Sequence, residues 1–218
     1  GIGSRTISDG TKADKLVYAV YKLDEKKTPV LQKVVNSDAN GQFIKDDFKS
    51  GDNVSVTLAK GQTYQVAFWA QDGDCSAYTT TDLQNVAVDY ANAANNDEFR
   101  DAFFKTVEFT VAGNKTIDVV LKRPFAQINV GVTKADWEAA VASGITIAQS
   151  SVVIKNAATN LNLLDGTVSG ETEVSYSLAN IPADPAILEV DTDGDGTKEE
   201  YNWLSMSYIL AFDGEESE

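Results

Sequence analysis

The residues with the clearest chemical potential in this sequence are three alternating aspartates, Asp191, Asp193 and Asp195, which are followed by Gly196. Carboxylates at relative positions 1, 3 and 5 with glycine at position 6 match the first half of a calcium-binding loop. Position 12, where such a loop carries a bidentate glutamate, is Asn202. The flanking segments also have the pattern of strands, and an Asp/Gly-rich hairpin turn has the same composition. We therefore expect a hairpin turn, with weak calcium binding as the alternative, and no other cofactor.

Few residues of this chain could act in catalysis. The chain has no histidine, which excludes a Ser-His-Asp triad, a Cys-His pair and imidazole metal ligands. Its single cysteine, Cys75, lies among aspartates, which raise a thiol pKa and reduce its nucleophilicity. The neighbouring carboxylates Asp46-Asp47 and Glu199-Glu200 point to opposite faces of a strand, so neither forms a converging glycosidase pair. We expect a protein without enzymatic activity.

Three tryptophans offer a second kind of chemistry, the stacking of sugar rings on exposed indoles. Trp69, Trp137 and Trp203 would form such a platform if their side chains were exposed. Each lies in a patterned element, so we expect burial of Trp137. Trp69 alternates with Val66 and Phe68, and we expect it on the outer face of its strand.

Charge narrows the range of partners. The 218 residues include 33 acidic and 18 basic side chains and carry a net charge of −15. Nucleic acid and anionic membrane surfaces are disfavoured, because both repel such a surface. No apolar run approaches the roughly 20 residues that span a bilayer.

The elements that would position these residues are mostly strands. Apolar and mostly polar residues alternate with a period of two, which is typical of strands with one buried face. The first strand, at 16–23, is apolar enough to be buried on both faces. The clearest alternating strands are expected at 53–59, 63–70, 106–111 and 116–122, with the last two forming a hairpin.

One helix interrupts this pattern. Thr133 is a suitable N-cap, with Asp136 three residues further on, and Gly144 stands where a helix would end. The helix is predicted at 136–143. Pro124 removes a ladder donor and marks the expected boundary between two β-rich domains, 1–124 and 125–218. Each is predicted to be a Greek-key sandwich, which makes the fold class mainly β.

Four stretches resemble the fimbrillin family, the pilus subunits of Gram-negative anaerobes, also known as type V pilus subunits. They are 14–22 (DKLVYAVYK), 101–110 (DAFFKTVEFT), 121–130 (LKRPFAQINV) and 203–210 (WLSMSYIL). The third is the most specific, because a similar Lys-Arg-Pro strand opens the second domain of such proteins.

The resemblance implies two transthyretin-like Greek-key β-sandwich domains in tandem and export as a lipoprotein to the outer membrane. In this family an arginine-directed protease removes the N-terminal strand, and a strand from another subunit fills the groove. Arg5 is the only arginine before the first predicted strand, so the resemblance marks it as the processing point. The chain departs from the family at 213–218, where members continue into further strands.

The expected function is a structural subunit, accessory protein or tip adhesin of a cell-surface fimbria. Its partners would be other fimbrial subunits, joined by strand addition, together with host or bacterial surface ligands. The alternative is a cell-surface glycan-binding lipoprotein module. An open groove along a sandwich edge would favour the first, whereas an exposed cluster of aromatic residues would favour the second.

Overall fold

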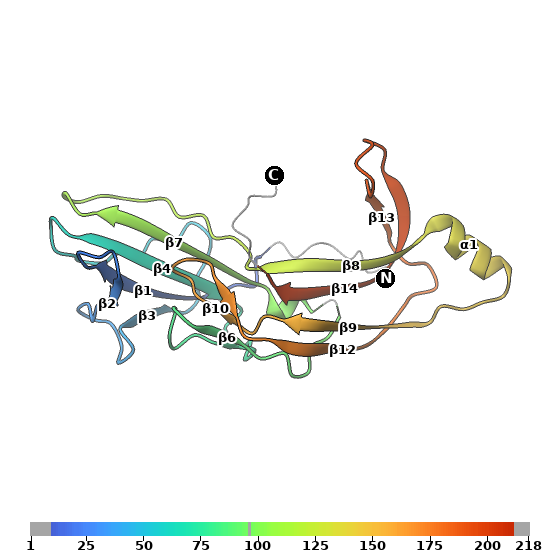
Figure 1. The fold of residues 1–218 in the computed structure, drawn as a ribbon, viewed down its shortest axis with the longest axis horizontal. Helices are drawn as coiled ribbons and strands as arrows, with labels where there is room; N and C mark the ends of the chain where they lie inside the picture. The colour runs from blue at the N-terminus through green and yellow to red at the C-terminus, as the bar shows by residue number, and fades with distance from the viewer. Residues whose placement is uncertain (1–9, 96, 212–218) are drawn as a thin grey trace.

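The computed structural model describes residues 10–95 and 97–211, and it shows an elongated, almost entirely β molecule (Figure 1). The predicted mainly β fold class is confirmed, with antiparallel pairing in every sheet. The elements of the described part are β1 (Lys15–Leu23), β2 (Pro29–Leu31), β3 (Gln42–Lys45), β4 (Thr63–Gln71), β5 (Tyr78–Thr79), β6 (Val86–Val88), the 3-10 helix η1 (Glu98–Arg100), β7 (Ala102–Thr110), β8 (Phe125–Thr133), α1 (Lys134–Ala142), β9 (Gln149–Ala157), β10 (Asn160–Leu161), β11 (Val168–Ser169), β12 (Thr172–Asn180), β13 (Ile187–Val190) and β14 (Glu199–Leu210).

The N-terminal half is organised around one sheet with the order β2-β1-β4-β7, in which β3 also pairs with β1. Its central strand β1 is apolar on both faces, as predicted, and six consecutive residues of it are buried. Val66 of β4 pairs with Val20 of β1 on one side and Val107 of β7 on the other. The sheet therefore forms a middle layer with apolar side chains on both faces.

Two cores lie on opposite faces of this sheet, because successive side chains of a strand point to opposite sides. The first core consists of Val17, Ala19, Tyr21, Ala67, Trp69, Leu83, Val86, Val88, Ala102, Phe104, Leu161, Leu163 and Leu210. The second core consists of Leu16, Tyr18, Val20, Tyr64, Val66, Phe68 and Ala70.

Strand pairing crosses the predicted boundary at Pro124. The short strands β10 and β11 follow β9 in the chain, yet β10 pairs with β6 in a sheet ordered β11-β10-β6-β5. Leu161 lies opposite Val86 there and enters the first core. The division into two domains remains a prediction, but residues from both sides of the boundary share this sheet and this core.

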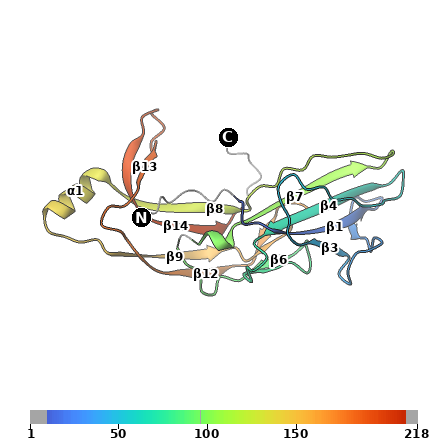
Figure 2. The same cartoon turned by 180° about the vertical axis from the view of Figure 1, so that it is seen from behind.

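The C-terminal half consists of a sheet ordered β13-β14-β8 and a pair of strands, β9 and β12. A third core, formed by Ala93, Ala157, Val174, Tyr176 and Ile209, lies in this half. The β13–β14 hairpin projects from the body of the molecule. The helix α1 lies at the end of the molecule that is opposite β1, β2 and β3 (Figures 1 and 2).

The predicted helix is confirmed as α1. Thr133 caps it, because the Thr133 hydroxyl accepts a hydrogen bond from the Asp136 amide at 3.2 Å. Gly144 follows the helix with a φ of +72°, the left-handed conformation that glycine adopts at a helix end. Trp137 is its one buried residue, as expected.

Two predicted strands are not formed. Residues 53–59 and 116–121 belong to no strand of the described structure, although both have the alternating pattern. The expected hairpin between 106–111 and 116–122 is reduced to a single antiparallel bridge between Phe104 and Lys122. We name these two stretches, 53–59 and 116–121, the alternating segments.

Candidate functional site

The strongest candidate site is the outer side of the second core, over which the alternating segments pack. In the first segment, Val54, Val56 and Leu58 are half-buried against the core, whereas Ser55 and Thr57 are exposed. This is the burial pattern of a strand with one face in a core. The sequence predicted that pattern correctly, but not the absence of a pairing partner.

The second segment repeats the pattern. Val119 and Leu121 are half-buried against the second core, whereas Asp118 and Val120 are exposed, Val120 by 71%. Figure 1 shows this part of the chain as a thin trace that returns from the end of β7 toward β8. The second core is thus covered by two strand-like segments from distant parts of the sequence.

Backbone pairing stops at the ends of both segments. The Gly61 amide donates to the Val111 carbonyl at 2.7 Å, and the Val111 amide donates to the Gln62 carbonyl at 3.0 Å. Phe104 and Lys122 exchange two hydrogen bonds, of 2.8 and 2.9 Å. Between these points, neither segment forms a ladder with another part of the described chain. The backbone groups of a strand-like segment without a ladder are available to pair with an added strand.

The edge of the middle sheet at β7 is also incomplete. β7 pairs along its whole length with β4, but on its other side the described structure provides only the bridge at Phe104. Beyond that bridge the Thr106 hydroxyl donates to the Leu163 carbonyl at 2.5 Å. A sheet edge of this kind presents unpaired N–H and C=O groups.

The floor of the site is aromatic and firmly packed. The Tyr18 ring stacks on Phe43 with centroids 4.9 Å apart and on Phe68 with centroids 5.7 Å apart. Burial raises the pKa of Tyr18, so its hydroxyl stays protonated in the neutral range. The floor offers apolar contact and no nucleophile, which suits recognition of apolar side chains.

The acidic loop predicted from the sequence lies at the tip of the β13–β14 hairpin. One carboxylate oxygen of each of Asp191, Asp193 and Asp195 lies within 4.8 Å of the others, and all three residues are exposed. The Asp191 carboxylate also accepts hydrogen bonds from the amides of Gly194 (2.7 Å) and Gly196 (2.9 Å). The bond from Gly196 is the largest cause that lowers the pKa of Asp191. The hairpin turn accounts for these contacts, and calcium binding remains a prediction.

The tryptophans are buried. Trp69 has no exposed surface and belongs to the first core, so its predicted outward orientation is wrong. Its indole N–H donates to the Gln71 side chain at 2.9 Å, which explains how a polar ring atom is accommodated there. Trp137 and Trp203 are 9% and 5% exposed. None of the three can form a platform for sugar stacking.

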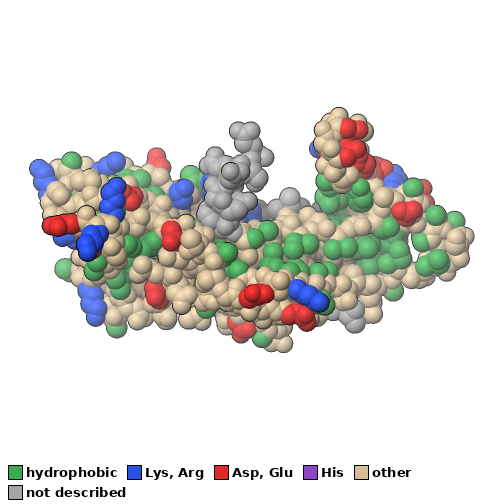
Figure 3. Space-filling model, in the orientation of Figure 1, with side chains coloured by type: hydrophobic (Ala, Val, Ile, Leu, Met, Phe, Trp, Pro, Cys, Tyr) green, Lys and Arg blue, Asp and Glu red, His purple; other side chains and the backbone are tan. Residues whose placement is uncertain are grey.

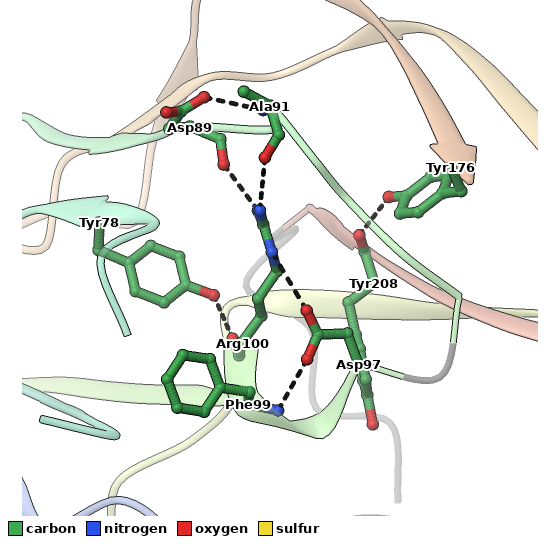
Figure 4. A network of polar contacts seen from close by, with 8 residues as sticks. All are labelled: Tyr78, Asp89, Ala91, Asp97, Phe99, Arg100, Tyr176 and Tyr208. Atoms are coloured by element: carbon green, nitrogen blue, oxygen red, sulfur yellow. Dashed lines mark hydrogen bonds and ion pairs between the residues drawn. The ribbon is translucent and has the colours of Figure 1, made fainter. Parts of the chain in front are cut away.

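Arg100 organises a polar junction that sequence reasoning missed (Figure 4). Its guanidinium donates to the carbonyls of Asp89 (2.6 Å) and Ala91 (2.8 Å) and forms an ion pair with Asp97 at 3.5 Å. The Tyr78 hydroxyl donates to the Arg100 carbonyl. Side chains here bind backbone carbonyls, so the junction fixes the geometry of the segments that contain Asp89, Ala91 and Arg100. The only signal in the sequence was an isolated arginine in a stretch without periodicity.

A second ion pair ties this region to the start of β8. The Arg123 guanidinium binds Asp101 with two hydrogen bonds, of 2.8 and 2.9 Å, and Asp101 is buried. The Arg123 guanidinium also lies 4.8 Å from the centre of the Phe103 ring. Cys75 is buried, and burial, not its acidic neighbours, is the largest cause that raises the pKa of its thiol.

The processing point implied at Arg5 lies outside the described residues, as do residues 213–218. Within the described part, no helix is long and apolar enough to cross a membrane.

Comparison with known proteins identifies a family and two distant structural neighbours. A family model described as "Family of unknown function (DUF6562)" matches residues 4–218. No curated protein sequence gives a significant match. One similar solved structure is a candidate polysaccharide-binding protein (DUF1812) from Bacteroides thetaiotaomicron, with 12% identity and a TM-score of 0.49 over 92% of this chain and 66% of that one.

The other neighbour is the fimbrial anchor protein Mfa2 from Porphyromonas gingivalis, with 13% identity and a TM-score of 0.46. The match covers 94% of this chain and 67% of that one, so this chain spans about two thirds of the length of each neighbour. At these identities the similarity is distant and concerns the fold alone.

Proposed function

The chain belongs to the DUF6562 family, and on that premise we propose that it is a structural or accessory subunit of a cell-surface fimbria that accepts an extended strand from another subunit. The family carries no assigned activity, so the support comes from the chain itself. The fimbrillin-like stretches supply the functional class, and the alternating segments supply the mechanism.

One observation carries the proposal: the alternating segments have the side-chain burial of strands without the backbone pairing of strands. A chain normally loses solvent hydrogen bonds only when it gains others, so segments packed on a core are usually paired. A strand laid beside either segment would bind their free backbone groups. It would also place every second side chain against the second core.

The energy of such pairing is sufficient for stable assembly. Burying four or five apolar side chains contributes roughly 1.5–3 kcal/mol each. This gain must exceed the loss of translational and rotational freedom and the cost of ordering the incoming segment. An extended segment with alternating Val or Ile residues can bury enough apolar surface to exceed both of these costs. A small polar molecule cannot.

The wider proposal concerns the export, processing and partners of the protein. The protein would be exported as a lipoprotein precursor, processed at Arg5, and displayed at the outer membrane. Fimbrial subunits would be its partners, and surface ligands would bind to an assembled filament. We further propose that the chain has no enzymatic activity and requires no cofactor, because its sequence has no histidine and no converging catalytic set.

A glycan-binding module is the weaker alternative. Its expected aromatic platform is not formed, since all three tryptophans are buried. Under this alternative, a sugar would bind in two adjoining open hollows beside the β9–β12 pair. One is lined by Lys155, Asn156, Glu171, Thr172 and Glu173, and the other shares Thr172 and Glu173 with it.

Hydrogen–deuterium exchange with a synthetic peptide tests the proposal. The peptide has nine residues, with Val or Ile at alternate positions and Thr or Lys between them, and a scrambled peptide of the same composition is the control. We expect the amides of 53–58 and 116–121 to exchange rapidly in the free protein and to become protected by the alternating peptide only, whereas the Ala59 amide already donates to the Tyr64 hydroxyl at 3.3 Å. Val56→Asp should abolish this protection, whereas Thr57→Asp, at the exposed neighbouring position, should retain it.

Protection of both segments in the free protein would contradict the proposal, because it would show that their backbone is already paired. Binding of a neutral glycan panel with protection confined to 155–156 and 171–173 would favour the alternative.

A further inference from the structure

The free side of β7 presents a regular set of backbone groups. Phe104 exchanges two hydrogen bonds with Lys122, so the N–H and C=O groups of Phe104 point away from β4. Backbone groups alternate in direction along a strand, so those of Thr106, Glu108 and Thr110 point the same way. The described structure gives these three residues no backbone partner on that side. An added antiparallel strand therefore has a ready set of partners along this stretch of β7.

Two charged side chains mark this edge, one on each face of β7. Lys105 lies opposite Phe68 of β4, on the face that carries the second core. Glu108 lies opposite Gln65 on the other face, and the Gln65 side chain donates to the Glu108 carboxylate at 3.1 Å. Both charged residues are exposed, and neither forms an ion pair in the described part of the chain. Figure 3 shows basic and acidic side chains together with hydrophobic ones at the surface of this end of the molecule.

The chain's own neighbour of β7, the alternating segment 116–121, does not match these charges. Phe104 and Lys122 form an antiparallel bridge, and continuing its register would place Asp118 directly opposite Glu108. Both of these acidic residues are exposed. Like charges directly opposite each other destabilise a cross-strand pair. The two carboxylates therefore give a physical reason why the ladder stops after one bridge.

The same register gives Lys105 no carboxylate partner. It would place Leu121 opposite Lys105, and Leu121 is half-buried against the second core. A lysine on the core-facing side of an edge strand is one of the devices that protect such an edge from unwanted pairing. This protection acts against strands that lack a matching carboxylate, whereas a strand that supplies one gains an ion pair. The charges on β7 thus disfavour the chain's own segment and favour a strand of the complementary pattern.

We propose that β7 selects its partner strand by charge. The partner is an extended segment of another protein chain that pairs antiparallel with β7. It carries a basic residue opposite Glu108 and, three residues later in its own sequence, an acidic residue opposite Lys105. The basic side chain points outward and the acidic one points toward the second core, because residues three apart lie on opposite faces of a strand. This inference rests on the proposed function, since it specifies the strand that the site accepts.

Two nine-residue peptides test the charge pattern. Both alternate Val with Thr. The matched peptide carries Lys at an outward position and Asp at the inward position three residues later, and the control peptide exchanges these two charges. By calorimetry we expect the matched peptide to bind about 10-fold more tightly, because it replaces two repulsive cross-strand pairs by two attractive ones. It should also protect the amides of Thr106, Glu108 and Thr110 from hydrogen exchange.

The double variant Lys105→Glu/Glu108→Lys should reverse the preference between the two peptides. Both substituted residues are exposed, so the fold should tolerate the exchange. Equal binding of the two peptides would overturn the charge inference and leave strand acceptance intact. Binding of neither peptide would contradict strand acceptance itself, and the charge inference with it.

Variants of Asp118 test the role of the chain's own segment. Asp118→Lys replaces the repulsion from Glu108 by attraction. The amides at positions 116, 118 and 120 should therefore become protected from exchange in the free protein, and the matched peptide should bind less tightly. Asp118→Glu is the matched control, because it keeps the like charges and should behave as the unmodified chain does. Equal protection in the two variants would show that charge does not keep segment 116–121 from pairing with β7, and would overturn that part of the inference.

Discussion

The two halves of this molecule use their strands in different ways. The N-terminal sheet buries apolar residues on both faces, and ten of the thirteen buried residues of its first core come from this half. The third core, in the C-terminal half, contains five. The long strands β8 and β9 there are mostly half-buried or exposed. Apolar burial is therefore denser in the N-terminal half, whereas β8 and β9 of the C-terminal half leave apolar side chains such as Val130 and Val153 exposed.

The largest expected effect is on the first core. Trp69→Ala should lower the free energy of unfolding by about 3–5 kcal/mol, because it leaves a large cavity at a site without solvent access. Val152→Ala, beside the third core, should cost about 1 kcal/mol, since that side chain is already half-exposed. Urea denaturation followed by circular dichroism measures both. Equal losses would contradict the contrast between the halves, and Trp69→Phe replaces Trp69→Ala if the latter does not fold.

The ion pair at the junction of the halves should give the next largest effect. Asp101→Asn removes a buried charge that binds Arg123 through two hydrogen bonds, so we expect a loss of about 1.5–3 kcal/mol. Asp97→Asn, whose 3.5 Å ion pair with Arg100 is longer and more exposed, should cost less than 1 kcal/mol. Thermal unfolding of the two variants gives the comparison. A smaller effect for Asp101→Asn than for Asp97→Asn would show that the buried Arg123–Asp101 ion pair stabilises the fold less than the Arg100–Asp97 pair does.

Alkaline titration compares one tyrosine from each half. Burial is the largest cause that raises the pKa of Tyr21, in the first core, and of Tyr176, in the third, from 10.0 to about 12. The folded state favours the neutral hydroxyl, so this contribution to stability is complete below pH 10 and is lost as the pH rises toward 12. We expect the free energy of unfolding to fall over that interval. Tyr21→Phe and Tyr176→Phe should each reduce the slope, and a slope unchanged by either variant would show that its hydroxyl is not shielded.

The smallest effect is expected at the tip of the β13–β14 hairpin. Asp193→Ala should change the melting temperature by less than about 2 °C, because exposed turn residues contribute within about 0.5 kcal/mol. Addition of 1 mM calcium should leave the melting temperature of the unmodified chain unchanged. Micromolar affinity by calorimetry, lost in Asp193→Ala, would instead establish a calcium site at this loop.

Local patterns predicted the elements well where each element depends on its own residues. A continuous apolar run located β1, period-two alternation located β4, and Thr133 with Gly144 located α1, since apolar runs, periodicity and caps are local properties. Pairing is not local, and the alternating segments show it: their pattern is that of strands, but no described neighbour completes them. The prediction that Trp69 points outward failed for a related reason. Alternation assigns residues to two faces of a strand, but both faces of the middle sheet are buried.

The candidate site was predictable only in part. The acidic loop was found from its spacing, and the strand-accepting groove expected from the family resemblance stays a prediction. Arg100 and Asp101 could not be identified, because their partners are backbone carbonyls and a side chain brought together by tertiary packing. A single sequence does not record such contacts.

The pairing of β10 with β6 also determines when the chain can fold. Leu161, Leu163 and Leu210 complete a core whose other members begin at Val17, so contacts across more than a hundred residues must form before that core is closed. Such long-range topology makes folding slow, because the loop-closure entropy is spent before the contacts are gained. During synthesis, a ribosome-bound chain that does not yet contain β14 would therefore remain without a finished first core.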